Sequence, residues 1–205
     1  MHSALSARAS GALRRCSLLM SQAVAMKPDL SDAYANLGGT LIERKLSAES
    51  RWFLDRAVIL DRHSAEAWNN LARQSESMGL WQSSKRQTSA AIAVSPAFLD
   101  GLYNLSTLHM GTGELNEALR GFERVKRIHP SHAKSMWNGG LVRLSLGEFQ
   151  RGWADYQWRF EVKPQDRTID TDNTFDATRD LTARVLVWGE QGVGDEVMFG
   201  SMLRE

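Results

Sequence analysis

The four prolines of this chain share one phase, and their spacing constrains the fold more than any other feature of the sequence. They occupy positions 28, 96, 130 and 164, so consecutive prolines are 68, 34 and 34 residues apart, and Arg62 fills the one position that the series skips. Proline ends helices because it lacks a backbone N–H. A helix stop that returns at a fixed step of roughly 20 to 50 residues is typical of solenoids, so the spacing predicts stacked repeats.

Aligning the chain in steps of 34 residues gives four full units, and residues 1–30 match the second helix of an earlier, partial unit. The full units are 31–64, 65–98, 99–132 and 133–166. In the first half of each unit, two positions carry mostly large residues and a third carries a small one. They are Tyr34, Trp68, Leu102 and Met136 at the fourth position, Leu37, Leu71, Leu105 and Gly139 at the seventh, and Gly38, Ala72, Ser106 and Gly140 at the eighth. Such spacing places them on one face of a helix.

The second half of each unit repeats in the same way, at spacings of four and three residues that predict a second, antiparallel helix. Its small and apolar positions are Ser50, Ser84, Ala118 and Gly152, then Leu54, Thr88, Phe122 and Tyr156, then Ala57, Ala91, Val125 and Arg159. The fifteenth position of the units holds Lys45, Gly79, Gly113 and Gly147. There we expect a left-handed backbone conformation to end the first helix and turn the chain into the second.

This pattern resembles the tetratricopeptide repeat, whose 34-residue unit carries Trp, Leu, Gly, Tyr, Ala, Phe, Ala and Pro at matching places. The segments AEAWNNLARQSESMGL and LYNLSTLHMGTGELNEALRGFERVKRIHP carry the resemblance, whereas Lys45, Arg62 and Arg159 depart from it. The resemblance implies an all-α fold, a right-handed superhelical solenoid of antiparallel helix pairs. The first helices of such a stack line a concave wall where an extended peptide or a partner helix can lie.

Every full unit has asparagine at its sixth position, namely Asn36, Asn70, Asn104 and Asn138. Asparagine is a mediocre helix former, so this row within helices needs a reason. One reason is peptide capture, because a primary amide offers an acceptor and two donors to a peptide backbone of any sequence. With first helices about 8 to 10 Å apart, each amide would meet about every third residue of an extended peptide. The other reason is structural: the amides bond to the backbone of the adjacent helix inside the stack.

A further resemblance favours peptide capture: the row is similar to the asparagine ladder that holds protein substrates in the superhelix of the O-linked N-acetylglucosamine transferases. Other side chains on the same expected wall are candidates for side-chain selectivity. They are Asn69, Arg73, Tyr103, Thr107 and Trp137.

The remaining conspicuous residues have structural explanations. Five of the seven tryptophans lie at helix or helix-entry positions, where core packing is expected, namely Trp52, Trp68, Trp81, Trp153 and Trp158. His129 and His132 flank Pro130 without a companion at ligand spacing, which predicts turn residues rather than a metal site. The cluster of Arg120, Arg124, Lys126 and Arg127 predicts a solvated helix face. No residue is nominated as catalytic, and we expect neither a metal nor a cofactor.

The composition limits the classes of partner that we expect for this chain. Lys and Arg number 25 against 24 Asp and Glu, and this net charge of +1 is too small for the broad basic field of non-specific nucleic-acid binding. No run of about eighteen apolar residues occurs, so we expect no membrane-spanning helix. The single cysteine, Cys16, excludes an internal disulfide and predicts a reducing, cytoplasmic setting.

Residues 1–27 are basic and serine-rich, which is compatible with a targeting helix. The phase of Cys16, Met20 and Ala23 favours a truncated repeat instead. An uncapped repeat end exposes an apolar face, which predicts self-association through the ends of the stack.

The sequence changes character after the fourth unit. Residues 167–183 mix threonine with aspartate and keep no helix or strand period, which predicts a linker. Residues 184–205 present a short β-branched run, a glycine-punctuated turn and a helical pattern from about residue 196, as at the start of an α/β domain. Gly192 and Gly194 in that turn are candidates for a nucleotide-sugar loop, although the motif is weak alone.

The segments GEFQRGWADYQWRF and VLVWGEQGVGDEVMF together resemble bacterial proteins in which tetratricopeptide repeats precede a glycosyltransferase-like domain. In that family most donor-binding residues lie in a second lobe, which this sequence does not reach, so the resemblance implies an incomplete enzyme. The favoured hypothesis is a protein-interaction module that binds peptide or partner protein segments in its concave groove. The alternative is the N-terminal fragment of a nucleotide-sugar-dependent glycosyltransferase whose repeats recruit the acceptor.

Overall fold

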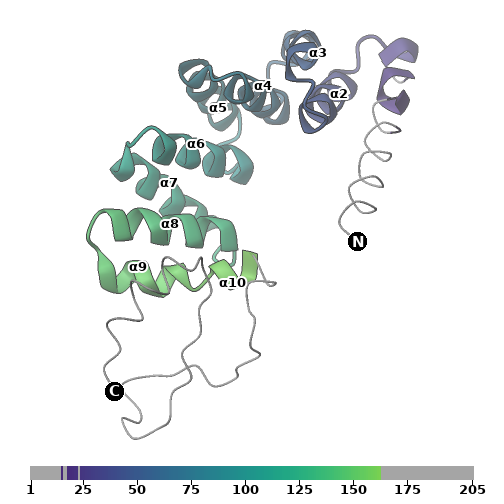
Figure 1. Ribbon diagram of the computed structural model, residues 1–205. Coiled ribbons are helices and arrows are strands. Elements are labelled where there is room, and N and C mark those ends of the chain that lie inside the picture. Colours follow the sequence, from purple (N-terminus) through teal and green to yellow (C-terminus); the bar gives the residue numbers. More distant parts are fainter. Residues whose placement is uncertain (1–14, 16–17, 23, 163–205) are drawn as a thin grey trace, which may run out of the picture.

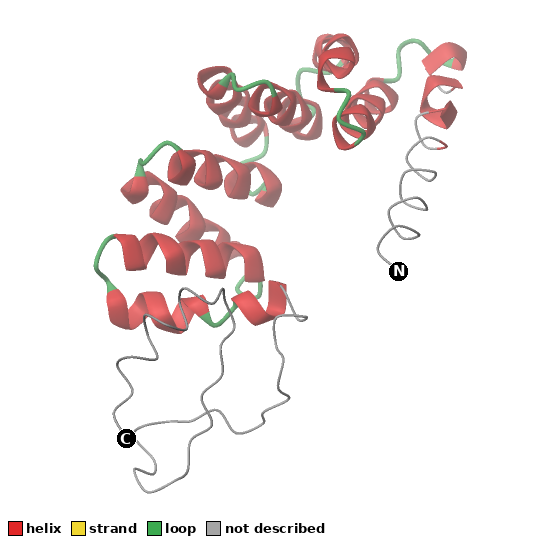
Figure 2. Cartoon of the chain, in the orientation of Figure 1, coloured by secondary structure: helices red, strands yellow, loops and turns green. Residues whose placement is uncertain are grey.

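The structure is a computed structural model that describes residue 15, residues 18–22 and residues 24–162. Every secondary-structure element in these ranges is a helix (Figure 2). Residues 18–22 and 24–26 are helical and precede the first helix pair. The predicted linker at 167–183 and the predicted strand, loop and helix at 184–205, with Gly192 and Gly194, lie outside the described residues. So do residues 1–14 of the predicted partial unit.

Four helix pairs follow one another, and their first helices begin 34 residues apart. The first helices are α2 (Ser31–Glu43), α4 (Ala65–Ser77), α6 (Leu99–Gly111) and α8 (Ala133–Ser145). The second helices of the first three pairs are α3 (Ser47–Leu60), α5 (Trp81–Val94) and α7 (Leu115–Ile128). The fourth second helix is divided into α9 (Phe149–Tyr156) and the short α10 (Arg159–Val162).

The turn inside each pair contains one residue in the left-handed region, as the fifteenth position predicts. The backbone angle φ is 62° at Lys45, 74° at Gly79, 77° at Gly113 and 83° at Gly147. Glycine adopts this conformation without steric cost, whereas the Cβ of Lys45 opposes it by roughly 1–2 kcal/mol. The first turn therefore keeps its geometry without the residue that favours it.

The repeated columns form the core. Leu54, Thr88 and Phe122 lie at one position of the second helices, and all three are almost completely buried. The eighth position of the first helices is small because the second helix passes close to it. At Gly140, for example, a Cβ atom would lie 2.8 Å from the backbone nitrogen of Tyr156. Close approach of the two helices and burial of one bulky column thus stabilise each pair.

The pairs stack into a curved two-layer rod (Figure 1). Along the stack, α2 contacts α4, α4 contacts α6 and α6 contacts α8. The second helices α3, α5 and α7 instead pack against the first helix of the following pair. In a curved stack the layer whose helices contact one another lies on the inner side, so the first helices form the inner layer. None of the described helices is both long and apolar enough to cross a lipid bilayer.

Candidate functional site

The asparagine row runs across the first helices, with one residue on each of α2, α4, α6 and α8. Three of the four amides donate a hydrogen bond to a residue 35 positions earlier, on the preceding first helix. Asn70 Nδ2 lies 3.3 Å from the carbonyl oxygen of Ala35, and Asn104 Nδ2 lies 2.9 Å from Asn69 Oδ1. Asn138 Nδ2 lies 3.2 Å from the Tyr103 hydroxyl. The row is therefore a ladder of bonds between units.

The structural explanation, a bond to the backbone of the adjacent helix, holds for Asn70. Asn104 and Asn138 bond instead to side chains of the adjacent helix. These bonds do not use up the hydrogen-bonding capacity of the amides, because each amide has two N–H groups and one carbonyl oxygen. The bond to Asn69 occupies one N–H of Asn104, and the bond to Tyr103 occupies one N–H of Asn138. Both residues are half-buried, and Asn36 at the head of the row is exposed.

The fifth-position residues beside the row differ in accessibility. Asn69 has only 6% of its surface exposed, so its amide supports Asn104 rather than facing solvent. Tyr103 and Trp137 are half-buried. Burial raises the pKa of the Tyr103 phenol, while the hydrogen bond from Asn138 acts in the opposite direction. Tyr103 therefore remains a neutral hydroxyl that accepts from Asn138.

The ninth-position residues lie one turn further along the same helix face. The Arg73 guanidinium donates to Asn70 Oδ1 at 3.2 Å, so the second amide has its carbonyl engaged as well. Thr107 donates its hydroxyl to the Tyr103 carbonyl at 2.6 Å. Burial raises the pKa of the nearby Glu76 carboxyl, and the charge of Arg73 partly offsets this. Of the predicted wall residues, Arg73 is thus the one that carries a charge beside the row.

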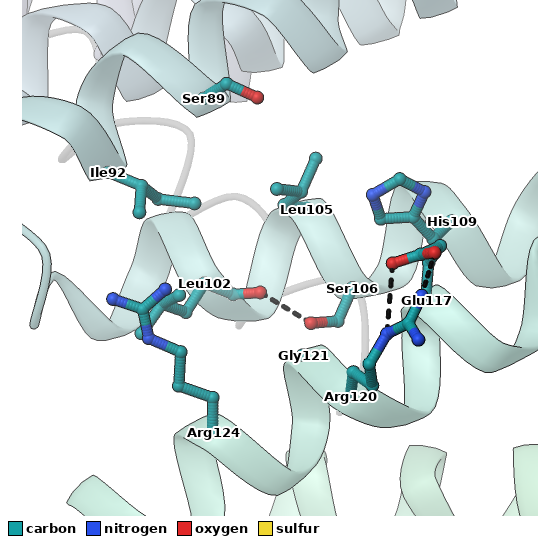
Figure 3. Close-up of a pocket in the computed structure, with 10 residues that line it drawn as sticks. All are labelled: Ser89, Ile92, Leu102, Leu105, Ser106, His109, Glu117, Arg120, Gly121 and Arg124. Atoms are coloured by element: carbon teal, nitrogen blue, oxygen red, sulfur yellow. Dashed lines mark hydrogen bonds and ion pairs between the residues drawn. The ribbon is translucent and has the colours of Figure 1, made fainter.

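A cavity of about 280 Å³ opens among α5, α6 and α7, and none of its lining residues belongs to the asparagine row (Figure 3). Ile92, Leu102 and Leu105 supply apolar surface, and Glu117 and Arg120 form an ion pair at the edge. Gly121 faces Ser106, whose hydroxyl donates to the Leu102 carbonyl at 2.7 Å. A Cβ at Gly121 would collide with that hydroxyl, so the two helices need glycine there.

An ionic cluster joins α7, α8 and α9. Arg143 lies at its centre with its side chain 10% exposed, and contacts Glu123, Glu148 at 2.5 Å and Asp155 at 3.1 Å. Lys126 also lies 3.5 Å from Asp155. Burial opposes the charge of Arg143, but the hydrogen bonds that the guanidinium donates to Glu123 and Glu148, together with their charges, outweigh burial and raise the pKa of the guanidinium. The cluster ties α7, α8 and α9 together, and none of its residues belongs to the asparagine row.

Sequence reasoning missed this cluster and the cavity. Arg143 and Asp155 occupy the eleventh and twenty-third positions of the fourth unit, and the same positions hold His109 and Gly121 in the third. A comparison of these two columns would have shown the opposite charges in one unit and the missing side chain in the other.

The structure corrects two expectations about side chains outside the row. The prediction of core packing is wrong for Trp52, Trp81 and Trp153, whose exposed fractions are 62%, 49% and 58%. Trp68 and Trp158 are half-buried. Trp52, Trp81 and Trp153 lie on the second helices α3, α5 and α9 at positions that the core columns do not include.

The basic cluster on α7 is only partly a solvated face. Arg120 and Arg127 are exposed, but Arg124 donates to the Pro96 carbonyl at 2.5 Å and Lys126 pairs with Asp155. Its two half-buried members therefore tie α7 to neighbouring units.

The two histidines lie at helix ends, as predicted for turn residues. His129 is the C-cap of α7, and His132 is the N-cap of α8, where its Nδ1 accepts from the Ser135 backbone N–H at 3.2 Å. Burial lowers the pKa of His132, and the charge of His129 lowers it further. In the described part of the chain, no three His, Cys, Asp or Glu side chains gather into a group suited to a metal ion.

Comparison with curated proteins gives two distant relatives, and no family model matches the chain. Protein FlbA of Caulobacter vibrioides is 27% identical over 182 residues, which cover 86% of this chain and 30% of FlbA. The human protein O-mannosyl-transferase TMTC3 is 25% identical over 137 residues, which cover 66% of this chain and 11% of TMTC3. The chain thus matches less than a third of the length of either relative.

Solved structures share the fold at low sequence identity. MamA superposes with a TM-score of 0.64 at 20% identity and covers 79% of this chain and 95% of MamA. Pseudomonas aeruginosa pilF gives 0.68 at 14% identity, with 77% and 72% covered. YrrB, described as a TPR protein with an unusual peptide-binding site, gives 0.58 at 15% identity, with 77% and 81% covered. The described residues therefore form an all-α, right-handed superhelical solenoid of antiparallel helix pairs, the fold of the TPR protein YrrB.

Proposed function

We propose that this protein binds an extended segment of a partner protein along the inner layer of first helices, with the asparagine row as the element that grips the peptide backbone. The observation that carries the proposal is the geometry of the row. Asn104 and Asn138 are each fixed by one bond to the preceding unit and retain one N–H and a carbonyl oxygen on a half-exposed surface.

Fixing the amides favours binding, because an oriented donor and acceptor lose little conformational freedom when a ligand arrives. A peptide backbone presents the same two groups at every residue, so the row tolerates many sequences. One row can therefore both bond to the preceding unit and bind a peptide. The bond between units uses one N–H of each amide, and the peptide uses the second N–H and the carbonyl oxygen.

Selectivity would come from the side chains beside the row, which differ from end to end. Arg73 carries a positive charge near the second unit. Tyr103 and Trp137 place aromatic rings near the third and fourth units. A peptide with an acidic residue toward the second unit and a bulky apolar residue toward the fourth matches this order. YrrB, which shares the fold, is described as having a peptide-binding site.

The experiment uses a matched pair of variants that break the same hydrogen bond from opposite ends. Asn104→Ala removes the bond to Asn69 and also the amide that we propose grips the peptide, whereas Asn69→Ala removes the bond and keeps that amide. Peptide arrays first identify ligands for the unaltered chain, and calorimetric titration then measures the affinity of each variant. Because one hydrogen bond contributes about 1 kcal/mol, we expect Asn104→Ala to weaken binding about fivefold and Asn69→Ala to leave it nearly unchanged.

Helicity and thermal unfolding of both variants separate recognition from stability. A ladder that is structural alone predicts equal losses of stability in the two variants and equal affinities for peptide. That result, or an unaltered chain that binds no peptide on the array, would reject the proposal.

We propose as a second candidate that the repeats are the acceptor-recruiting part of a glycosyltransferase. The match to human TMTC3, a protein O-mannosyl-transferase, is what favours it. The coding DNA beyond Glu205 tests the candidate directly, since a continuing frame with a second sugar-binding lobe supports it and an immediate stop opposes it. A titration of the 205-residue chain with uridine nucleotide sugars tests Gly192 and Gly194 in the same way.

A further inference from the structure

One face of each second helix packs against the first helix of the following pair, as α3, α5 and α7 show. On α7, Leu115, Leu119 and Phe122 pack in one cluster with Val142 of α8. On α3, Leu54 and Val58 pack with Leu71 of α4. The twenty-fourth position of a unit is thus an interior position when a further first helix follows. The twenty-first position is packed in this way at Leu119, whereas Arg51 at the same position of α3 keeps 43% of its side chain exposed.

The same positions in the fourth unit are Trp153 and Tyr156 of α9, with Phe149 one turn before them. We call these three residues the aromatic face. Trp153 is 58% exposed, whereas Leu119 at the equivalent position of α7 is half-buried. The rings of Trp153 and Tyr156 meet edge to face, with centroids 5.5 Å apart. The Arg159 guanidinium lies 4.6 Å from the Tyr156 centroid, so one edge of the aromatic face is covered and the Phe149–Trp153 side is open.

An open pair of large aromatic side chains is costly in water, because burying either ring contributes roughly 1.5–3 kcal/mol. The packing of α8 against α7 indicates what fits the aromatic face: an apolar segment that packs across α9 in the same way. The next unit in phase does not supply it, since residues 167–179 hold Asp170 and Asn173 at the fourth and seventh positions, where first helices carry large residues.

We propose that the aromatic face is the docking site for residues 184–205 of the same chain. This segment holds two apolar runs, at 185–188 and 197–199, and a further apolar pair at 202–203. Residues 163–183 connect it to α10, and 21 residues are long enough for the proposal, since even a chain of that length without regular structure spans roughly 25 Å, more than the roughly 12 Å length of α9. A tether of this kind gives an effective concentration near the millimolar range, which favours the chain's own segment over a second copy.

The first test places the photoreactive residue p-benzoylphenylalanine at position 153 of the complete 205-residue chain. We expect irradiation to join position 153 to residues 184–205 within one chain, in a yield that is unchanged when protein concentration rises about a hundredfold. The matched control carries the same group at position 52, which is equally exposed on α3, and should not reach residues 184–205. Adducts between two chains that increase with concentration would assign the aromatic face to self-association, and adducts elsewhere or none would also overturn the proposal.

The second test measures hydrogen exchange in the complete chain without a photoreactive group. Trp153→Ser removes the centre of the aromatic face, and Trp81→Ser removes an exposed tryptophan of α5 as the control. We expect the amides of residues 184–205 to exchange at least about tenfold faster in Trp153→Ser and at the unaltered rate in Trp81→Ser. Equal rates in the two variants, with α2 to α7 equally protected in both, would contradict docking at this face.

Discussion

The third and fourth helix pairs share one backbone plan but are held together by different forces. In the pair α6–α7, Phe122 is 2% exposed and fills the interior, while Gly121 leaves the cavity open beside Ser106. In the pair α8–α9, Tyr156 is only half-buried, and Arg143 joins Asp155 across the pair. One pair relies on an apolar side chain and the other on a buried cation with three carboxylates.

The repeat thus determines which positions of the two helices lie close together, but not whether the contact between them is apolar or ionic. The eleventh and twenty-third positions show this difference: Arg143 pairs with Asp155 in the fourth unit, whereas His109 and Gly121 line the cavity in the third. A buried ion pair is much more sensitive to the loss of one partner than an apolar contact, because the remaining charge is left without compensation. The two pairs should therefore respond differently to substitution.

The largest effect is expected in the ionic pair. Arg143→Met keeps much of the side-chain volume but leaves Glu123 and Glu148 without this cation and Asp155 with Lys126 alone. We expect the free energy of unfolding to fall by about 3 kcal/mol. Chemical denaturation followed by circular dichroism measures the loss. Arg120→Met is the control, because Arg120 is exposed and pairs with Glu117 on its own helix; a loss as large there would mean that charge reduction alone is responsible.

A smaller effect is expected where the third pair needs glycine. Gly121→Ala pushes a methyl group into the buried Ser106 hydroxyl, and overpacking of this kind costs about 1–2 kcal/mol. Ser106→Ala removes the hydroxyl, after which the nearest side-chain atom lies 3.1 Å from the added Cβ. The double variant should recover most of the loss in a double-mutant cycle. If the two effects simply add, the close approach of Gly121 to Ser106 is not what limits this position.

The smallest effect concerns the junction between the two pairs, where His132 caps α8. Its folded-state pKa is lowered below the ordinary value of 6.5, chiefly by burial, so the unfolded chain takes up the proton first as the pH falls. The cap is fully formed above about pH 6.5 and is lost as the pH falls through the folded-state pKa. Protonation of Nδ1 removes the acceptor of the Ser135 N–H, and the loss of an N-cap costs about 1 kcal/mol.

Thermal unfolding at a series of pH values between about 4 and 8 checks this prediction. His132→Asn keeps a side chain that caps helices but does not titrate, so its unfolding temperature should vary less with pH over that range. An unchanged pH profile in His132→Asn would show that another group controls the acid response of the junction.

The helix pairs and their turns could be predicted because each depends on a pattern that recurs. Gly79, Gly113 and Gly147 mark the left-handed turns, and Phe122 and Leu54 lie on a column whose burial the spacing alone indicates. Lys45 shows that the register carries the prediction even where the favoured residue is absent. The asparagine row was visible for the same reason, since four equal residues share one position.

Features that occur in a single unit could not be predicted in this way. Arg143 has no counterpart of like charge at its position in the other units, and its three partners lie on three separate elements or turns. The exposure of Trp153 depends on whether a further helix covers α9, which a residue's hydrophobicity does not reveal. The ladder of Asn104 and Asn138 depends on side-chain geometry between helices.

The sequence by itself determined the step of the repeat, the two helices of each unit and the residues that face inward, because these follow from local periodicity and from where the backbone can turn. Tertiary structure decided which polar groups pair between units, which aromatic side chains stay in water and where a cavity remains. Those outcomes depend on the distance and angle between helices that are remote in sequence, and periodicity within one helix carries no information about either.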